Sequence, residues 1–183
     1  MSATIKWYNL KQASLQLDTG WRKPKGQIIL AKSLAKSSFK PKAGDKIYDW
    51  NNKLVFSISP EEACLILRWF NALKTKDPTK DKVDALSLSH SPSGNMKQDY
   101  KNLTFNPGND GSGKWLINVT ISDNTGNKIT FTLSKDRIIM FMDWLDFVKR
   151  LYIVHQIAEI FAATVYDRRE THVNRQTQNP TRS

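Results

Sequence analysis

Residues 52–74 read NKLVFSISPEEACLILRWFNALK, and residues 127–149 read NKITFTLSKDRIIMFMDWLDFVK. The second stretch lies 75 positions after the first, and six of the 23 aligned positions are identical, Trp69 and Trp144 among them. Self-similarity at a fixed shift is typical of a duplicated structural unit. The chain is therefore predicted to contain two copies of one unit.

Each copy begins as a strand and continues as a helix. Apolar and polar residues alternate along residues 54–58 and 129–133, which predicts strands with one buried face. Ser59 then precedes a proline and two glutamates, so it is predicted to cap a helix, with Glu62 completing a capping box. Ser134 takes the equivalent place in the second copy.

The likeness between the copies extends upstream with small shifts. It pairs three segments of the first half with three of the second: 14–17 with 85–88, 26–33 with 101–108, and 46–50 with 115–122. Each half then consists of four strands and a helix. The predicted fold class is α+β, with two four-stranded antiparallel sheets, each followed by a helix, related by a pseudo-twofold axis.

The predicted organisation is one domain over residues 1–170 followed by a flexible polar tail over 171–183. Within the domain we expect half repeats over about 13–74 and 85–149, a linker over 75–84 and a helix over 150–169.

The charge of the chain predicts a polyanionic partner. Lys and Arg number 28 against 17 Asp and Glu, and residues 1–60 alone hold 11 basic and 3 acidic side chains. Nucleic acid and an anionic membrane are the two ordinary partners for such a balance. A soluble basic protein with no such partner is the alternative that charge leaves open.

Residues 21–30, WRKPKGQIIL, concentrate this charge beside an indole. We interpret them as a hairpin shoulder that enters a strand. Ile28 and Leu30 are expected to point inward, and Lys25, Gln27 and Ile29 outward.

The sequence contains no recognisable catalytic or metal-binding pattern. His90, His155 and His172 are far apart and lack metal-ligand spacing. Residues 110–114, DGSGK, lack the spacing of a phosphate-binding loop and are better interpreted as a hairpin turn. We therefore expect a protein that is not an enzyme and that uses no metal or other cofactor.

Cys64 is the only cysteine, which fits an intracellular, reducing compartment. Because it lies in an apolar run, we expect a buried thiol rather than a nucleophile. The first residues lack the apolar core of a signal peptide, and no apolar run reaches the length of a membrane helix. A phage or bacterial origin is a reasonable expectation, and an organelle is possible if a presequence has been removed.

Binding chemistry for a single nucleic-acid strand has better support, since it needs cations for phosphates and aromatic faces for bases. Aromatic residues on the predicted strands and turns stand close to lysines and arginines, although each could instead fill the core. The predicted nucleic-acid-binding residues are Trp21, Arg22, Lys23, Lys25, Gly26, Gln27, Lys32, Lys46, Tyr48, Trp50, Lys53 and Trp115.

Three stretches in this order resemble the Whirly family of single-stranded-DNA-binding proteins. Residues 25–30, KGQIIL, are similar to the family's K-G-K-A-A-L strand, and residues 48–59 are similar to its Y-D-W strand-turn-strand segment. Residues 110–119 are similar to its D-G-S-G hairpin. The likeness covers roughly residues 20–165.

The resemblance implies two sheets packed like whirligig blades on a helical core, tetramers formed through the helices, and single strands bound along the sheet edges. Gln27 departs from the family pattern, because it replaces the lysine associated with assembly beyond the tetramer. Ile28 and Ile29 stand in place of two alanines.

The leading hypothesis is a largely sequence-independent single-stranded-DNA-binding protein. It would protect or organise DNA in replication, repair or recombination. We expect a homo-oligomer, with a tetramer favoured over other sizes. One alternative is an RNA-binding or annealing protein on the same fold, because nothing in the sequence marks a reader of the 2′-hydroxyl. Another is a transcription-regulating interaction module.

Overall fold

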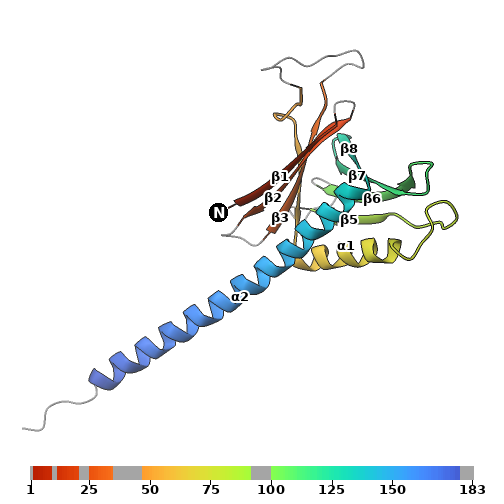
Figure 1. The fold of residues 1–183 in the computed structure, drawn as a ribbon. Helices are drawn as coiled ribbons and strands as arrows, with labels where there is room; N and C mark the ends of the chain where they lie inside the picture. Colours follow the sequence, from red (N-terminus) through yellow and green to blue (C-terminus); the bar gives the residue numbers. More distant parts are fainter. Residues whose placement is uncertain (1, 10–11, 21–24, 35–46, 92–99, 178–183) are drawn as a thin grey trace, which may run out of the picture.

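A computed structural model describes residues 2–9, 12–20, 25–34, 47–91 and 100–177 (Figure 1). The first half contains β1 (Ser2–Tyr8), β2 (Ala13–Gly20), β3 (Lys25–Lys32), β4 (Leu54–Ile58) and α1 (Pro60–Leu73). The second contains β5 (Leu86–His90), β6 (Lys101–Asn109), β7 (Trp115–Asp123), β8 (Lys128–Leu133) and α2 (Lys135–Thr177). Each half forms one antiparallel four-stranded sheet in sequential order, β1-β2-β3-β4 and β5-β6-β7-β8. The predicted fold class is confirmed.

The first strand of the first sheet is β1, not the segment beginning at Ser14. Ile5 and Trp7 of β1 pair with Leu17 and Leu15 of β2, which places their side chains on the inner face. The strand predicted at residues 46–50 is wrong for the described part of that segment. Tyr48 makes only an isolated bridge with Ser33, because β3 already pairs directly with β4. The counterpart of β7 is therefore β3.

The start of α1 follows the prediction from sequence. The amide of Glu62 donates to Ser59 Oγ at 3.2 Å, and the amide of Ser59 donates to Glu62 Oε2 at 2.9 Å. Both halves of the capping box are present, with Pro60 at the first helical position. Cys64 is exposed, contrary to our expectation, because it lies beside the buried stripe of α1 that contains Ala63 and Ile66.

The core lies between the inner faces of the two sheets and the two helices. Phe70 of α1, Phe105 of β6 and Phe141 of α2 are buried, and their ring centroids are each 5.8 Å from one another. Aromatic pairs at this distance stabilise a core beyond their buried area. This three-ring cluster joins both helices to the second sheet and fixes how the halves sit together.

The second helix is longer than predicted. It runs to Thr177, whereas we expected a helix to end near residue 169 and a flexible tail from 171. No glycine or proline interrupts residues 135–177, and the next proline is Pro180, outside the described residues. α2 packs on the body with its first turns and then projects alone (Figure 1). None of the helices in the described ranges is both long and apolar enough to cross a membrane.

Candidate nucleic-acid interface

A groove lies between the edge strand β4 of the first sheet and one end of the second sheet. It consists of two recesses of about 730 and 530 Å³ that share Lys101. Leu54 lines the first recess, and the next residue of β4, Val55, lines the other. The two recesses share the side chain of Lys101 and are lined by consecutive residues of β4. We therefore treat them as one feature, the inter-sheet groove.

The strand ends of the second sheet form the opposite wall. His90 ends β5, Lys101 begins β6, and Asp123 ends β7, and these three residues are neighbours across the sheet. Lys128 begins β8 beside them. Antiparallel pairing therefore brings side chains from all four strands to the same end of the sheet.

Lysines dominate the charge of the inter-sheet groove. Five line it: Lys25, Lys32, Lys53, Lys101 and Lys128. The described acidic residues of the lining are Asp49 and Asp123. Five cations against two carboxylates leave a surplus of positive charge, which attracts phosphates.

The two aspartates are held by their own turns. Asn52 donates from its side chain to Asp49 Oδ2 at 2.8 Å, and this hydrogen bond lowers the pKa of Asp49. Burial alone would raise the pKa of Asp123, but hydrogen bonds from Thr125 and Asn127 outweigh it, and the pKa falls below its ordinary value. Both carboxylates are therefore ionised at neutral pH and shape the loops of the groove.

The repeat brings equivalent residues together in this groove. Asn52 and Lys53 precede β4, Asn127 and Lys128 stand at the start of β8, and all four line the same recess. The two Asn-Lys pairs, 75 positions apart in the sequence, therefore lie on the same surface.

Neutral hydrogen-bonding groups accompany the lysines at the other end of the groove. Ser57, Ser89 and Ser91 line it together with His90. The buried Oγ of Ser91 has no hydrogen-bond partner among the described residues. Hydroxyl groups beside lysines suit phosphate oxygens and the edges of bases.

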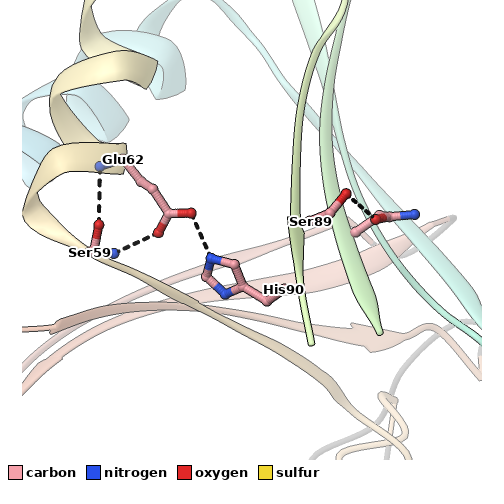
Figure 2. Close-up of polar contacts among 5 residues, drawn as sticks. Ser59, Glu62, Ser89 and His90 are labelled. Carbon is pink, nitrogen blue, oxygen red and sulfur yellow. Dashed lines mark hydrogen bonds and ion pairs between the residues drawn. The ribbon is translucent and has the colours of Figure 1, made fainter. Parts of the chain in front are cut away.

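His90 connects this wall to the start of α1. Figure 2 shows its ring beside Glu62, with Nε2 2.6 Å from Glu62 Oε1. The same carboxylate completes the capping box with Ser59, and the His90 ring stacks on Phe56 at 4.2 Å. The hydroxyl of the neighbouring Ser89 instead donates a hydrogen bond to Asn102 Oδ1 on the next strand (Figure 2). These contacts hold β5 against β4 and so set the width of the groove.

The structure brings together only part of the predicted site. Lys25, Lys32 and Lys53 line the inter-sheet groove. Gln27 is exposed on the outer face of β3, where it pairs with Ser57 of β4. Four predicted residues lie outside the described part of the chain: Trp21, Arg22, Lys23 and Lys46.

Gly26 has a different role from the one predicted. We expected it to let the backbone approach a ligand, but it is buried on the inner face of β3. A Cβ atom there would lie 2.9 Å from Trp144 and 3.0 Å from Val148. The absence of a side chain at this position allows α2 to pack closely on the sheet.

The predicted stacking aromatics are dispersed. Tyr48 is buried, with its ring 5.5 Å from Tyr8, and burial raises its pKa. Trp50 is half-buried, and Lys6 Nζ lies 5.6 Å from its ring centroid. Trp115 lies at the opposite end of β7 from the groove, where Nε1 donates to the Leu73 carbonyl at 3.1 Å. Trp50 and Trp115 are both half-buried, and none of these three aromatic residues lines the inter-sheet groove.

Ile29 points to the outer face of the sheet, as expected, but its side chain is buried there. On the outer face it lies between Gln16 of β2 and Val55 of β4, and these neighbours flank it in the sheet. Ile28 and Leu30 are buried on the inner face as predicted.

Sequence reasoning missed Lys101, Lys128 and His90. Residues 61–134 hold nearly equal numbers of basic and acidic side chains, so charge alone did not single these residues out. The repeat offered a signal for one of them, because Lys128 is the equivalent of Lys53 at a shift of 75.

The outer face of the second sheet has a different character. Cross-strand hydrogen bonds join neutral side chains there, including Ser87 with Thr104 at 3.1 Å and Thr120 with Thr130 at 2.9 Å. A neutral face of this kind attracts phosphates less strongly than the lysine-lined groove.

Two β4α repeats with a lysine-lined groove between their sheets define a duplicated α+β protein of the nucleic-acid-binding class. The sequence matches the model of the Whirly transcription factor family over residues 16–142, and the chain belongs to that family. Membership supports nucleic-acid binding in general.

The fold is also similar to a solved structure described as crystal structures of Trypanosoma bruciei MRP1/MRP2. The TM-score is 0.49 at 6% sequence identity, and the alignment covers 82% of this chain and 93% of that one. No curated protein matches the sequence.

Proposed function

We propose that this protein binds single-stranded DNA with little sequence preference and acts without catalysis. It would protect or organise the strand during replication, repair or recombination. The observation that carries the proposal is the inter-sheet groove, where five lysines face neutral hydroxyl and amide groups.

The shape of the groove favours a single strand. Proteins that read duplex DNA insert a helix or a β-ribbon into the major groove. Here the cations instead line a recess along β4, whose length from Lys53 to Ser57 is about 13 Å at ~3.3 Å per residue. A single strand can lie in such a recess with its phosphates on the lysines and its bases against the Ser and Asn side chains of the lining.

The projecting part of α2 supports a homotetramer. Between residues 151 and 161, apolar side chains cover about 180° of the helix circumference at ~100° per residue. The polar residues of the same segment, such as Glu159 and Gln156, occupy the other half. Several of the apolar side chains are 48–67% exposed: Ile153, Val154, Ile157, Ile160 and Phe161. A stripe this wide is broader than a two-helix seam needs, so we propose contacts with more than one neighbouring copy.

Fluorescence anisotropy with labelled oligo-dT, the matching duplex and oligo-U tests the proposal across a salt series. If all five groove lysines contact phosphates, the slope of log K against log salt is about −3.5, at ~0.7 per contact for single strands. That slope corresponds to a loss of about 100-fold between 50 and 200 mM salt.

A double variant, Lys53→Ala with Lys128→Ala, should reduce the slope by about 1.4. The matched control is Lys80→Ala, because Lys80 is exposed and pairs with Asp77 away from the groove residues. Duplex binding equal to or tighter than oligo-dT binding would contradict the proposal. Preference for oligo-U would transfer it to RNA, and an unchanged slope in the double variant would remove the groove as the site.

A further inference from the structure

A second positively charged cavity lies at the other end of the second sheet. It has a volume of about 370 Å³ and is formed by the end of α1, the β6–β7 hairpin and the first turns of α2. Trp115 belongs to this cavity, while Asp123 at the far end of β7 belongs to the inter-sheet groove. The two ends of β7 are about 26 Å apart at ~3.3 Å per residue, so the two sites are separate.

The floor of this cavity is apolar. Phe70, Leu73, Ile138, Ile139 and Met142 line it. Ile139 is 52% exposed, so part of this apolar surface is open to solvent. Exposed apolar surface inside a concavity of this size is typical of a ligand-binding site.

Lysines surround the apolar floor. The four are Lys74, Lys76, Lys114 and Lys135, and all are exposed. None of the described residues that line the cavity is acidic, and the nearest carboxylate in the hairpin, Asp110, interacts with Lys114. We refer to this feature as the lysine-rimmed pocket.

The pocket is rigidly built at its centre. The indole of Trp115 donates to the Leu73 carbonyl at 3.1 Å and so fastens the hairpin to the end of α1. In the hairpin itself, Asp110 Oδ1 accepts from the amides of Ser112 and Lys114 at 2.8 and 3.1 Å. The lysine at position 114 is therefore held on an ordered turn beside the apolar floor.

We propose that the lysine-rimmed pocket binds an acidic peptide segment that carries a bulky apolar side chain. The apolar side chain would enter the floor, and flanking carboxylates would meet the four lysines. Charge complementarity of this kind determines specificity and speeds association. Met142 adapts the floor to side chains of different shape, because methionine is flexible and polarisable.

The observations favour a peptide over nucleic acid at this position. A base needs partners for its polar edge, but the described side chains of the pocket offer only ammonium groups and an indole N–H that is already bonded. The inter-sheet groove, in contrast, supplies hydroxyl, amide and imidazole groups.

Binding of a fluorescein-labelled peptide, Asp-Glu-Asp-Leu-Phe-Glu-Asp, to the full chain tests this inference. Replacing its Leu and Phe by Ala provides a peptide with the same charge and no anchor. The Lys114→Glu, Lys135→Glu double variant should bind the labelled peptide about tenfold or more weakly, because attraction becomes repulsion. The matched control is Lys53→Glu with Lys128→Glu, which should weaken oligo-dT binding and leave peptide binding within about twofold.

The design separates this inference from the proposed function, since each pair of substitutions addresses one site. Unchanged peptide affinity in the Lys114→Glu, Lys135→Glu variant, equal binding of the alanine peptide, or displacement of the peptide by oligo-dT would each overturn the inference. The Ile139→Asp variant should no longer bind the peptide, and the mass of its assembly in light scattering should stay unchanged. A fall in mass would instead assign this face to contact between copies and would also overturn it.

Discussion

Replacing Gly26 by alanine should destabilise the protein, because α2 packs directly on this residue. The added methyl group would lie 2.9 Å from Trp144 Cη2 and 3.0 Å from Val148 Cγ2. Trp144 is 3% exposed and Val148 is 1% exposed, so neither side chain can move away into solvent. A separation below 3.0 Å therefore requires the sheet or the helix to shift.

The size of the effect follows from two opposing contributions. Overpacking a well-packed core costs about 1–3 kcal/mol. Alanine restricts the unfolded chain more than glycine does, which returns about 0.4–1 kcal/mol. We expect a net loss of about 1–2 kcal/mol, and a fall in Tm of about 2–4 °C for each kcal/mol in a chain of this length.

Thermal and denaturant unfolding at one fixed protein concentration would measure the effect. Gly108→Ala is the matched control, since Gly108 is also in a strand and a Cβ there meets only the Leu116 carbonyl, at 3.9 Å. Adding Trp144→Phe to Gly26→Ala should recover part of the loss, because phenylalanine lacks the ring atoms that the methyl group meets. It also removes the buried Nε1 of Trp144, which has no hydrogen-bond partner among the described residues.

Equal stability of the Gly26→Ala and Gly108→Ala variants would refute this reasoning. Affinity for oligo-dT provides a second check at a temperature where both variants are folded. If Gly26→Ala weakened binding while its stability stayed the same, Gly26 would have the ligand-approach role that its sequence context first indicated.

Three further perturbations test separate parts of the structure. Ser59→Ala removes the cap of α1 and should cost about 1 kcal/mol in denaturant unfolding, and an unchanged midpoint would contradict the importance of this cap. The folded-state pKa of Asp123 lies below its ordinary value of 3.8, so its contribution to stability is present above that pH and is lost as the pH falls through the folded pKa. In the Asp123→Asn variant, the free energy of unfolding should therefore fall less steeply as the pH is lowered. An equally steep fall in the variant and the unchanged protein would contradict this prediction. A chain ending at Arg150 should keep the far-ultraviolet spectrum of the two sheets, but light scattering should show fewer copies per assembly. An unchanged number of copies would place the subunit contacts elsewhere.

The order of strands and helices could be predicted where the sequence repeats itself. β4 with α1 and β8 with α2 share identical residues at one shift, and the starts of both helices at Pro60 and Lys135 keep that shift. Upstream the repeat is weaker, and the likeness of residues 46–50 to 115–122 predicts a strand around Tyr48 in place of β1. Hydrogen-bonding partners decide such a case, since β3 has only two edges and β2 and β4 occupy both.

The candidate site could be predicted only in part, because it forms between segments distant in the chain. Local charge identified Lys25, Lys32 and Lys53 on the first sheet. Lys101 completes the groove from the second sheet, but its own segment is nearly neutral and contains no motif. Its position became clear only from strand register, which places it beside Asp123 at the sheet end.

The difference between the two helices explains how one duplicated unit forms several surfaces. Both start at the same place in the repeat, but α1 ends at Leu73 and Pro78 follows soon after, whereas Ile153 occupies the equivalent position in α2. A proline interrupts helical hydrogen bonding, and an isoleucine does not. The chain after α1 therefore turns back, and Pro78 becomes part of the lysine-rimmed pocket. The chain after the same point in α2 instead continues as a helix away from both sheets, which leaves the inter-sheet groove uncovered by either helix.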